Sequence, residues 1–159
     1  SILLPLTQAA ERGDIEAIQI LLNYGADINA VCGDGFTALG HAILKQKYTI
    51  ARILLEKYNL ALSQFDSDLF SGDCIGHLLV QSFKFNLTGF RTGRAQQYLQ
   101  LLRLICRIND ALIFNVYNDQ DLVAKDMFIE LFTSYKTGIN DSLDAFVEQV
   151  RHVILDKQY

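Results

Sequence analysis

The sequence predicts an all-α domain built from repeated pairs of helices, and three observations support this prediction. Proline occurs once in the 159 residues, at Pro5, while glycine, asparagine and aspartate gather in short breaks between apolar runs. Such breaks are typical of turns between helices. Inside the runs, apolar residues recur at helical spacing, as at Ile15, Ile18 and Leu22. The chain also matches itself after a shift of 33 residues, which indicates an internal repeat.

The composition fits one folded domain over residues 1–159 and argues against several classes of function. Half of the residues are apolar and a fifth are charged, which is enough for a continuous core. The formal net charge is −4, so the surface as a whole lacks the positive charge of a nucleic-acid binder. No apolar run approaches the ~20 residues that span a bilayer. We therefore expect a monomer with no membrane segment, no cofactor and no nucleic-acid partner for the surface as a whole, so that any nucleic-acid contact would have to be local.

The cysteines bear on the cellular compartment of the protein, and the first residue bears on whether the sequence is a fragment of a longer protein. Cys32, Cys74 and Cys106 are odd in number and widely spaced. This pattern favours reduced thiols over a disulfide framework and predicts a cytoplasmic protein. The chain begins with a serine and enters a helical pattern almost at once. A fragment of a longer protein and the removal of an initiator methionine both fit that beginning.

Two helix pairs are predicted at the start of the chain. Leu6 begins the first helix and Gly13 ends it. Asp14 is placed to cap the second helix, which ends at Gly25. Core positions recur in the next pair, because equivalent helix pairs stack on one another. The shift of 33 residues aligns Leu6 with Leu39, Ala9 with Ala42, Ile20 with Ile53, Leu21 with Leu54 and Leu22 with Leu55.

These two units resemble ankyrin repeats. PLTQAAERGDIEAIQILLNYGADINA is similar to one repeat and DGFTALGHAILKQKYTIARILLEKY to a second, at the period of that family. In the family, a threonine and a histidine hold the turn at the start of the first helix. The missing histidine is therefore expected to loosen the second repeat. The family pattern G-x-T-P-L-H-x-A-A is met at Gly35, Thr37, Leu39 and Ala42, with Ala38 in place of proline and Gly40 in place of histidine.

The resemblance implies an ankyrin-repeat solenoid of about four helix-turn-helix units joined by short hairpin loops. The stretch GADINAVCGDGFT would form the β-hairpin finger between the first two units. Gly25 would stop the preceding helix, and Gly33 and Gly35 would allow the turn. We place the units at about residues 1–30, 31–63, 64–113 and 114–159.

The third and fourth units are degenerate. In GDCIGHLLVQSF, Gly72, Cys74 and His77 occupy the glycine, threonine and histidine positions of the pattern. The fourth pair consists of NVYNDQDLVAKDMFIELF and DSLDAFVEQVRHVILDK and has lost most of the turn signature, as terminal repeats often do.

A long insertion is predicted between the helices of the third unit. KFNLTGFRTGRAQQ, residues 84–97, is longer than the tight turn of the family. We expect a loop that projects from the stack and carries a small basic and aromatic cluster, which consists of Lys84, Phe85, Phe90, Arg91 and Arg94. Such a cluster suits a phosphate, an acidic peptide or a single-stranded nucleic acid. In the alternative, the phenylalanines of the segment pack back on the helices and the arginines are solvated.

Cys74 and His77 raise the question of catalysis. Their spacing would place a thiol and an imidazole on one face of a helix. The corresponding alternative function is a thiol-dependent enzyme, or a substrate-recruiting segment of a larger enzyme. The repeat alignment already explains both residues as turn and cap positions, so we expect a non-catalytic protein.

No metal or nucleotide site is predicted. Cys74 and His77 make half of a tetrahedral site, and no other residues have the ligand spacing to complete it. The residues considered are Cys32, His41, Cys106 and His152. Neither glycine cluster is followed by the Lys-Ser/Thr of a phosphate loop.

The resemblance to ankyrin repeats implies a module that binds a partner protein on its concave surface, made of the finger tips and the first helix of each pair. Phe36 and Phe70 are the predicted anchors, because an exposed aromatic has much contact area to give. Asp34 and Asp73 favour a partner with a basic surface. The residues that map to this surface are Glu11, Arg12, Gly33, Asp34, Phe36, Lys45, Phe70, Ser71, Asp73, Gln81 and Ser82.

Two narrower expectations follow. Leu21, Asp27, Ile28 and Asn29 have the spacing recognised by the asparaginyl hydroxylase that acts on ankyrin repeats, with Asn29 as the acceptor. The alternative is that Asn29 only hydrogen-bonds the hairpin backbone. The many Asn, Gln, Ile, Lys and Phe residues, with no tryptophan, resemble the ankyrin proteins that intracellular bacteria deliver into eukaryotic cells. On that resemblance the chain would be an effector that acts on host proteins in the host-cell cytoplasm.

Overall fold

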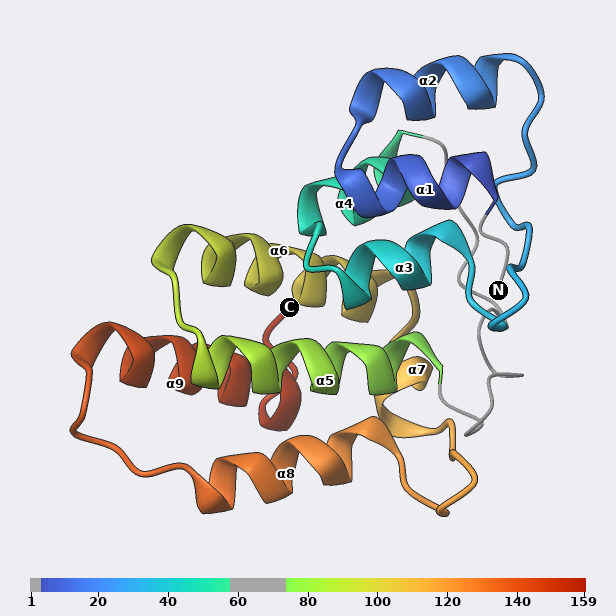
Figure 1. The fold of residues 1–159 in the computed structure, drawn as a ribbon. Coiled ribbons are helices and arrows are strands. Elements are labelled where there is room, and N and C mark those ends of the chain that lie inside the picture. Colours follow the sequence, from blue (N-terminus) through green and yellow to red (C-terminus); the bar gives the residue numbers. More distant parts are fainter. Residues whose placement is uncertain (1–3, 58–73) are drawn as a thin grey trace.

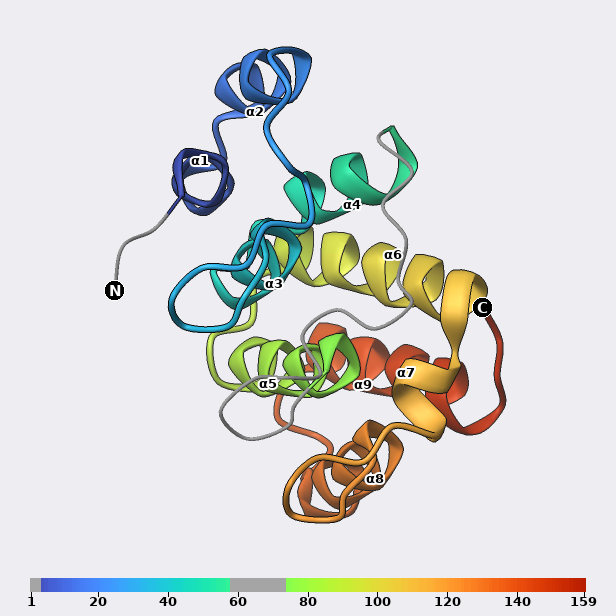
Figure 2. The same cartoon turned by 90° about the vertical axis from the view of Figure 1, so that its right-hand side faces the viewer.

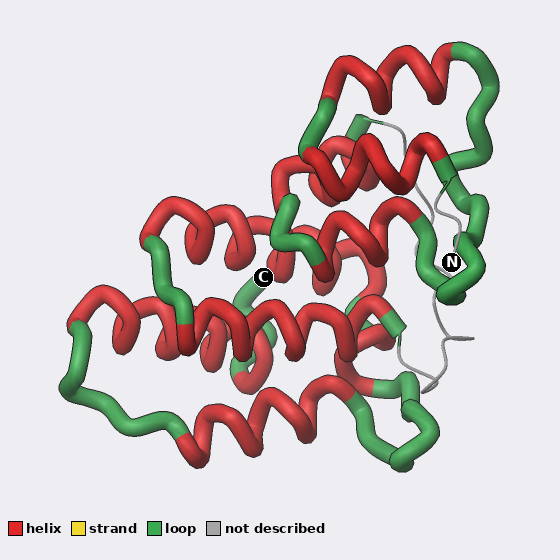
Figure 3. Tube along the Cα trace, in the orientation of Figure 1, coloured by secondary structure: helices red, strands yellow, loops and turns green. Residues whose placement is uncertain are grey.

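The computed structural model describes residues 4–57 and 74–159. No strand is present among these residues (Figure 3), so the all-α prediction is confirmed. The helices are α1 (Pro5–Arg12), α2 (Ile15–Asn23), α3 (Ala38–Leu44), α4 (Tyr48–Glu56), α5 (Ile75–Thr88), α6 (Thr92–Asn109), α7 (Ala111–Phe114), α8 (Ala124–Ser134) and α9 (Asp141–Leu155).

The helices pack as four consecutive pairs, which is the predicted solenoid (Figures 1 and 2). The first helices of the pairs, α1, α3, α5 and α8, lie side by side in chain order and form one layer. Behind them, α4, α6 and α9 form a second layer, while α2 packs on α1. The short helix α7 is an addition to the pattern and contacts α5, α6 and α8. The predicted boundary between the second and third units lies outside the described residues.

Short polar residues and glycines determine where the first helices begin and end. Gly13 ends α1 in the left-handed conformation, with φ of +74°. Asp14 then caps α2, because its Oδ1 accepts a 3.0 Å hydrogen bond from the N–H of Ala17. Beyond the end of α2, Gly25 has φ of +91°. The predicted roles of Gly13, Asp14 and Gly25 are confirmed.

The core runs through all four pairs but changes in character along the chain. In the first two pairs it contains many small side chains, among them Ala9, Ala10, Ala38, Ala42 and Ala51. In the last two pairs it contains an aromatic cluster, which consists of Phe83, Tyr98, Phe128, Phe132 and Phe146.

The loop predicted over residues 84–97 is wrong, because both helices of the third pair extend into it. α5 runs to Thr88 and α6 begins at Thr92, so only residues 89–91 connect them. The longer helices are stabilised by packing on α9, where the ring of Phe90 lies 5.9 Å from that of Phe146. The additional residues therefore lengthen the helices and do not form a projecting loop.

Candidate functional site

The connection between α2 and α3 ends in a tight turn over residues 32–37, which we call the finger. The N–H of Cys32 donates to the carbonyl of Phe36, and the N–H of Gly35 donates to the carbonyl of Cys32, each at 2.9 Å. The Asp34 carboxylate accepts the N–H of Phe36 at 3.0 Å. Gly35 has φ of +87°, whereas Gly33 has no positive φ, so only one of the two predicted glycines is needed. The finger is a closed turn without the paired strands of a hairpin.

Thr37 follows the finger and caps α3. Its hydroxyl accepts the N–H of Gly40 at 3.3 Å, as expected for the threonine of the repeat pattern. The histidine of that pattern is absent at position 40, and His41 occupies the next position on the helix.

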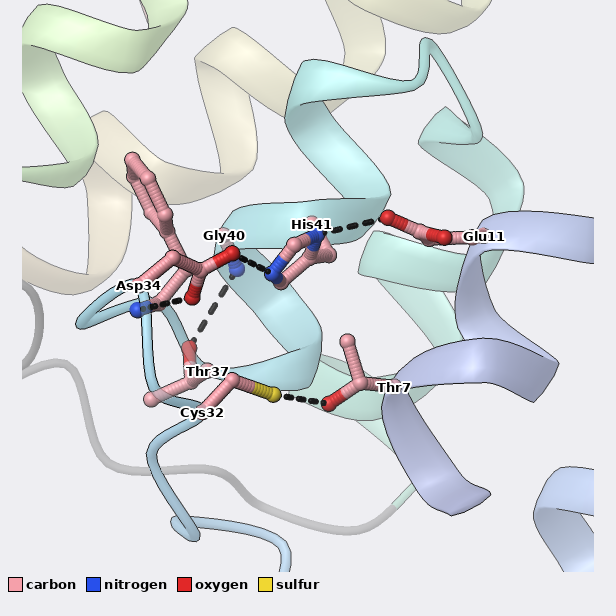
Figure 4. A network of polar contacts seen from close by, with 8 residues as sticks. Thr7, Glu11, Cys32, Asp34, Thr37, Gly40 and His41 are labelled. Carbon is pink, nitrogen blue, oxygen red and sulfur yellow. Dashed lines mark hydrogen bonds and ion pairs between the residues drawn. The ribbon is translucent and has the colours of Figure 1, made fainter. Parts of the chain in front are cut away.

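His41 joins the finger to α1 (Figure 4). Its Nδ1 lies 2.8 Å from Oε1 of Glu11 on α1, and its Nε2 lies 2.8 Å from Oδ2 of Asp34 in the finger. The buried thiol of Cys32 donates to Oγ1 of Thr7, also on α1, at 3.2 Å. These contacts hold the finger against both α1 and α3.

A shallow groove, which we call the concave groove, runs along α1, α3, α5 and α8 on the side of the finger. Its first part is lined by residues that include Glu11, Asp34, Phe36, Leu44, Lys45 and Phe85. Its second part is lined by Val80, Gln81, Lys84, Phe85, Thr88 and Met127. Gln81 and Phe85 belong to both parts, so the two parts adjoin.

Most of the predicted partner-binding residues that the structure describes lie in or beside this groove. Glu11, Asp34, Phe36, Lys45 and Gln81 line it. Arg12 and Gly33 are exposed. Phe70, Ser71 and Asp73 lie outside the described residues.

Ser82 is a correction to that prediction. It is 1% exposed, and its hydroxyl donates to the carbonyl of Ile43 at 3.0 Å. Ser82 therefore ties α5 to α3 and offers nothing to a partner, because α5 turns this position toward the neighbouring helix.

Phe90, Arg91 and Arg94 do not gather into a binding loop. Phe90 packs toward α9, Arg91 is exposed, and the guanidinium of Arg94 donates to the carbonyl of Gly89. The alternative in which a phenylalanine packs back on the helices therefore holds for Phe90. Phe85 differs, since it is 50% exposed and lines the concave groove.

Phe85 is a groove residue that the sequence analysis assigned to the projecting loop instead. Gln81 and Phe85 are four residues apart and so share one face of a helix, which could have placed them together. The loop predicted over residues 84–97 hides this spacing, because it places Phe85 outside the helix.

Cys74 and His77 cap the N-terminus of α5, as predicted from the repeat pattern. The N–H of Cys74 donates to Nδ1 of His77 at 3.0 Å. The Nε2 of His77 lies 2.9 Å from the carbonyl of Leu122, to which it donates. The thiol of Cys74 donates to the carbonyl of Leu112 at 3.3 Å. Both nitrogens of the imidazole are engaged by the backbone, so this histidine has no free nitrogen to accept the proton of the thiol.

Asn29 lies exposed between α2 and the finger. Its N–H donates to Oδ1 of Asp27 at 2.9 Å. Its hydroxylation stays a prediction.

Sequence reasoning also missed a group of potential metal ligands. One such atom from each of Cys32, Asp34 and His41 lies within 4.8 Å of the other two. The linear spacing has no metal signature, because these residues meet only when the finger folds against α3. The prediction of no metal site did not anticipate this group.

Comparisons with known proteins agree with the fold. The sequence model of the family described as ankyrin repeats (many copies) matches residues 6–55. The crystal structure of the ankyrin repeat domain of Bcl-3, described as a unique member of the IkappaB protein family, has a TM-score of 0.60 and 19% sequence identity over 94% of this chain. Residues 6–55 contain ankyrin repeats, and the chain has the ankyrin-repeat fold. The match spans 51% of the Bcl-3 chain, so about half of that ankyrin domain corresponds to it.

A curated relative matches a third of the chain in sequence. The ARF GTPase-activating protein Git of Drosophila melanogaster is 46% identical over 52 residues, which are 33% of this chain and 7% of that protein. Ankyrin repeats are generally protein–protein interaction modules. None of the helices in the described ranges is long and apolar enough to cross a membrane.

Proposed function

We propose that this chain binds a partner protein along the concave groove. The main support is that the two adjoining parts of the groove extend over α1, the finger, α3 and α5, with α8 at the far end. Binding along the first helices of the stack is also what the ankyrin fold suggests.

Two aromatic side chains would anchor the partner. Phe36 projects from the finger and is half-buried against His41, with the two rings 5.6 Å apart. Phe85 on α5 is half exposed. Both line the same part of the groove, so an apolar side chain of the partner would pack between them.

The charges along the groove would orient the partner. Glu11 and Asp34 lie at the α1 end of the groove. Because their two carboxylates face the single imidazole of His41, this end carries a net negative charge. Two lysines line the groove farther along: Lys45 directly follows α3, and Lys84 lies on α5. A basic group of the partner would therefore lie near α1, as Asp34 suggests from sequence, and an acidic group near α5.

Affinity capture from a eukaryotic cell lysate tests this proposal. Wild type is compared with a Phe36→Ala, Phe85→Ala double variant, after circular dichroism has shown that both are folded. The matched control is Tyr24→Ala, which removes an aromatic side chain that is 89% exposed and lies at the end of α2, away from the groove. We expect a protein that wild type and Tyr24→Ala both capture and that the double variant loses.

Two outcomes would contradict the proposal. Equal capture by wild type and the double variant would exclude Phe36 and Phe85 as anchors. Loss of folding in Phe36→Ala would make Phe36 a core residue and this map of the surface wrong.

The other sequence-based hypotheses have less support. Cys74 is 1% exposed and His77 fully buried, which disfavours the thiol-enzyme alternative at this pair. The cytoplasmic or host-cell location, the effector role and the monomeric state stay predictions.

A further inference from the structure

Three side chains beside the finger have the composition of a metal site. A carboxylate oxygen of Asp34, a ring nitrogen of His41 and the Sγ of Cys32 all lie within 4.8 Å of one another (Figure 4). Cys32 is 6% exposed and His41 is 5% exposed. Thiolate, imidazole and carboxylate are the ligand types that proteins use for Zn²⁺.

The orientation of His41 is a second observation that points to a metal. Its Nδ1 is hydrogen-bonded to Oε1 of Glu11 at 2.8 Å. Its Nε2 is buried and makes no hydrogen bond, although it lies 2.8 Å from Oδ2 of Asp34. A histidine that binds zinc almost always donates its other ring N–H to a carboxylate or carbonyl. Glu11 therefore orients the ring so that the lone pair of Nε2 is directed at the cluster.

The finger holds the other two ligands. Oδ1 of Asp34 accepts the N–H of Phe36 at 3.0 Å, which leaves Oδ2 for a metal. The backbone of Cys32 closes the turn, and its thiol donates to Thr7. Zinc–ligand distances of about 2.0–2.3 Å place tetrahedral ligand atoms about 3.3–3.7 Å apart. To reach that spacing, the 2.8 Å between Nε2 of His41 and Oδ2 of Asp34 must widen, and any separation near the 4.8 Å limit must shorten.

We propose that Cys32, Asp34 and His41 bind one Zn²⁺, with Glu11 as the hydrogen-bond partner of His41. The thiol of Cys32 gives its proton to solvent as the sulfur–zinc bond forms, so this residue releases one proton for each ion bound. A water molecule occupies the fourth position. The ion ties the finger to α3 and, through Glu11, to α1. Zinc binding does not depend on the proposed partner and is measured without it.

Zinc titration of the reduced, metal-free 159-residue chain, in competition with a chromophoric chelator, tests the proposal. We expect one ion per chain with a Kd below about 1 µM. Cys32→Ser keeps a hydroxyl near Thr7 but removes the thiolate, and we expect binding at least about 100-fold weaker. Glu11→Gln replaces the carboxylate beside His41 by an amide, whose oxygen is a weaker acceptor for the Nδ1–H, and we expect a loss of about 10-fold.

Cobalt(II) supplies a second readout that a merely structural role would not change. A thiolate-to-cobalt charge-transfer band requires a bond between sulfur and metal. We expect this band in wild type and in Glu11→Gln, and its absence in Cys32→Ser.

The matched control is His152→Gln. His152 lies 3.5 Å from Glu148 and 2.6 Å from Asp156, so it repeats the histidine and carboxylates of the cluster without a thiol, on an exposed helix face. We expect its zinc affinity to equal that of wild type.

Three outcomes would overturn the proposal. They are a wild-type Kd above about 1 µM, unchanged binding in Cys32→Ser, and loss of binding in His152→Gln. If Cys32→Ser does not fold, Asp34→Asn replaces it, because the amide oxygen of the new side chain still accepts the N–H of Phe36. Unchanged zinc binding in that variant would equally contradict the site.

Discussion

The helices of the first two pairs have seven to nine residues, whereas α5, α6, α8 and α9 have 11 to 18. Two of the short helices, α2 and α3, begin at the capping side chains Asp14 and Thr37. Left-handed residues separate the short helices: Gly13 before α2, Gly25 and Gly35 before α3, and Gln46 before α4. Many alanines lie between them. The long helices pack around the aromatic cluster instead.

This difference shows that one architecture can be specified in two ways. Where the repeat signature is present, the turns determine the helix ends, and small side chains allow close packing. Where the repeat signature is degraded, the burial of large apolar side chains stabilises the helices instead, since each such side chain contributes about 1.5–3 kcal/mol when fully buried. The family sequence model matches residues 6–55, which is the part specified by its turns and small side chains.

The largest expected effect tests the aromatic cluster. Phe83 is fully buried and contacts four other rings of the cluster. Phe83→Ala should lower the free energy of unfolding by about 3–5 kcal/mol, because it leaves a cavity at the centre of the last two pairs. Urea denaturation measures this loss. The control is Phe85→Ala on the same helix, at a half-exposed position, and an equal loss in both variants would contradict a special role for the cluster.

The next effect tests the cap of α5, which keeps part of the repeat signature. His77→Ala removes the hydrogen-bond partners of the Cys74 N–H and the Leu122 carbonyl. Leaving buried backbone groups unpaired costs about 1–3 kcal/mol, so we expect a loss of that size in urea denaturation. A loss below about 0.5 kcal/mol would show that the cap no longer matters once the aromatic cluster is present.

The corresponding cap in the first half is expected to contribute less. Thr37→Ala removes the acceptor of the Gly40 N–H and should cost about 1 kcal/mol. Thr37→Ser keeps the hydroxyl and should retain most of the stability in the same assay. If both variants lose equally, the methyl group of Thr37, and not its hydrogen bond, is what stabilises α3.

The smallest effect is pH-dependent and lies in the turn between α8 and α9. The hydroxyl of Tyr135 donates to Asp144 at 2.6 Å and the N–H of Gly138 donates at 2.9 Å, and these bonds lower the pKa of the carboxyl. A lowered pKa in the folded state stabilises the fold fully above the ordinary aspartate pKa, and the contribution is lost as pH falls through the lowered value.

Asp144→Asn should therefore unfold at a lower temperature than wild type near neutral pH, and the difference should vanish in acid. Thermal denaturation across the acid range measures it. Tyr135→Phe removes only the hydroxyl and should lose part of the same pH-dependent contribution. A difference that does not change with pH would mean that the charge of Asp144 contributes nothing.

Much of the fold could be predicted from the sequence, whereas the site could be predicted only in part. The pairing of helices and the caps at Asp14, Thr37 and Cys74 follow from local patterns. The course of residues 84–97 does not, because a glycine-containing segment extends the helices when packing against α9 favours it. Gly76 is similar: a Cβ there would lie 2.0 Å from the carbonyl of Leu112, which no local pattern reveals.

By itself, the sequence determined the helical class, the repeat and the helix ends at Gly13, Asp14, Gly25, Thr37 and Cys74, because capping and left-handed glycines act over a few neighbouring residues. Only the tertiary structure decided which side chains meet. Ser82 turned inward, Phe85 turned toward the groove, and Cys32 and Asp34 met His41 at the finger. Those outcomes depend on contacts between separate elements of the stack, such as the contact between Glu11 and His41, which are 30 positions apart in the sequence. The packing of whole helices establishes these contacts.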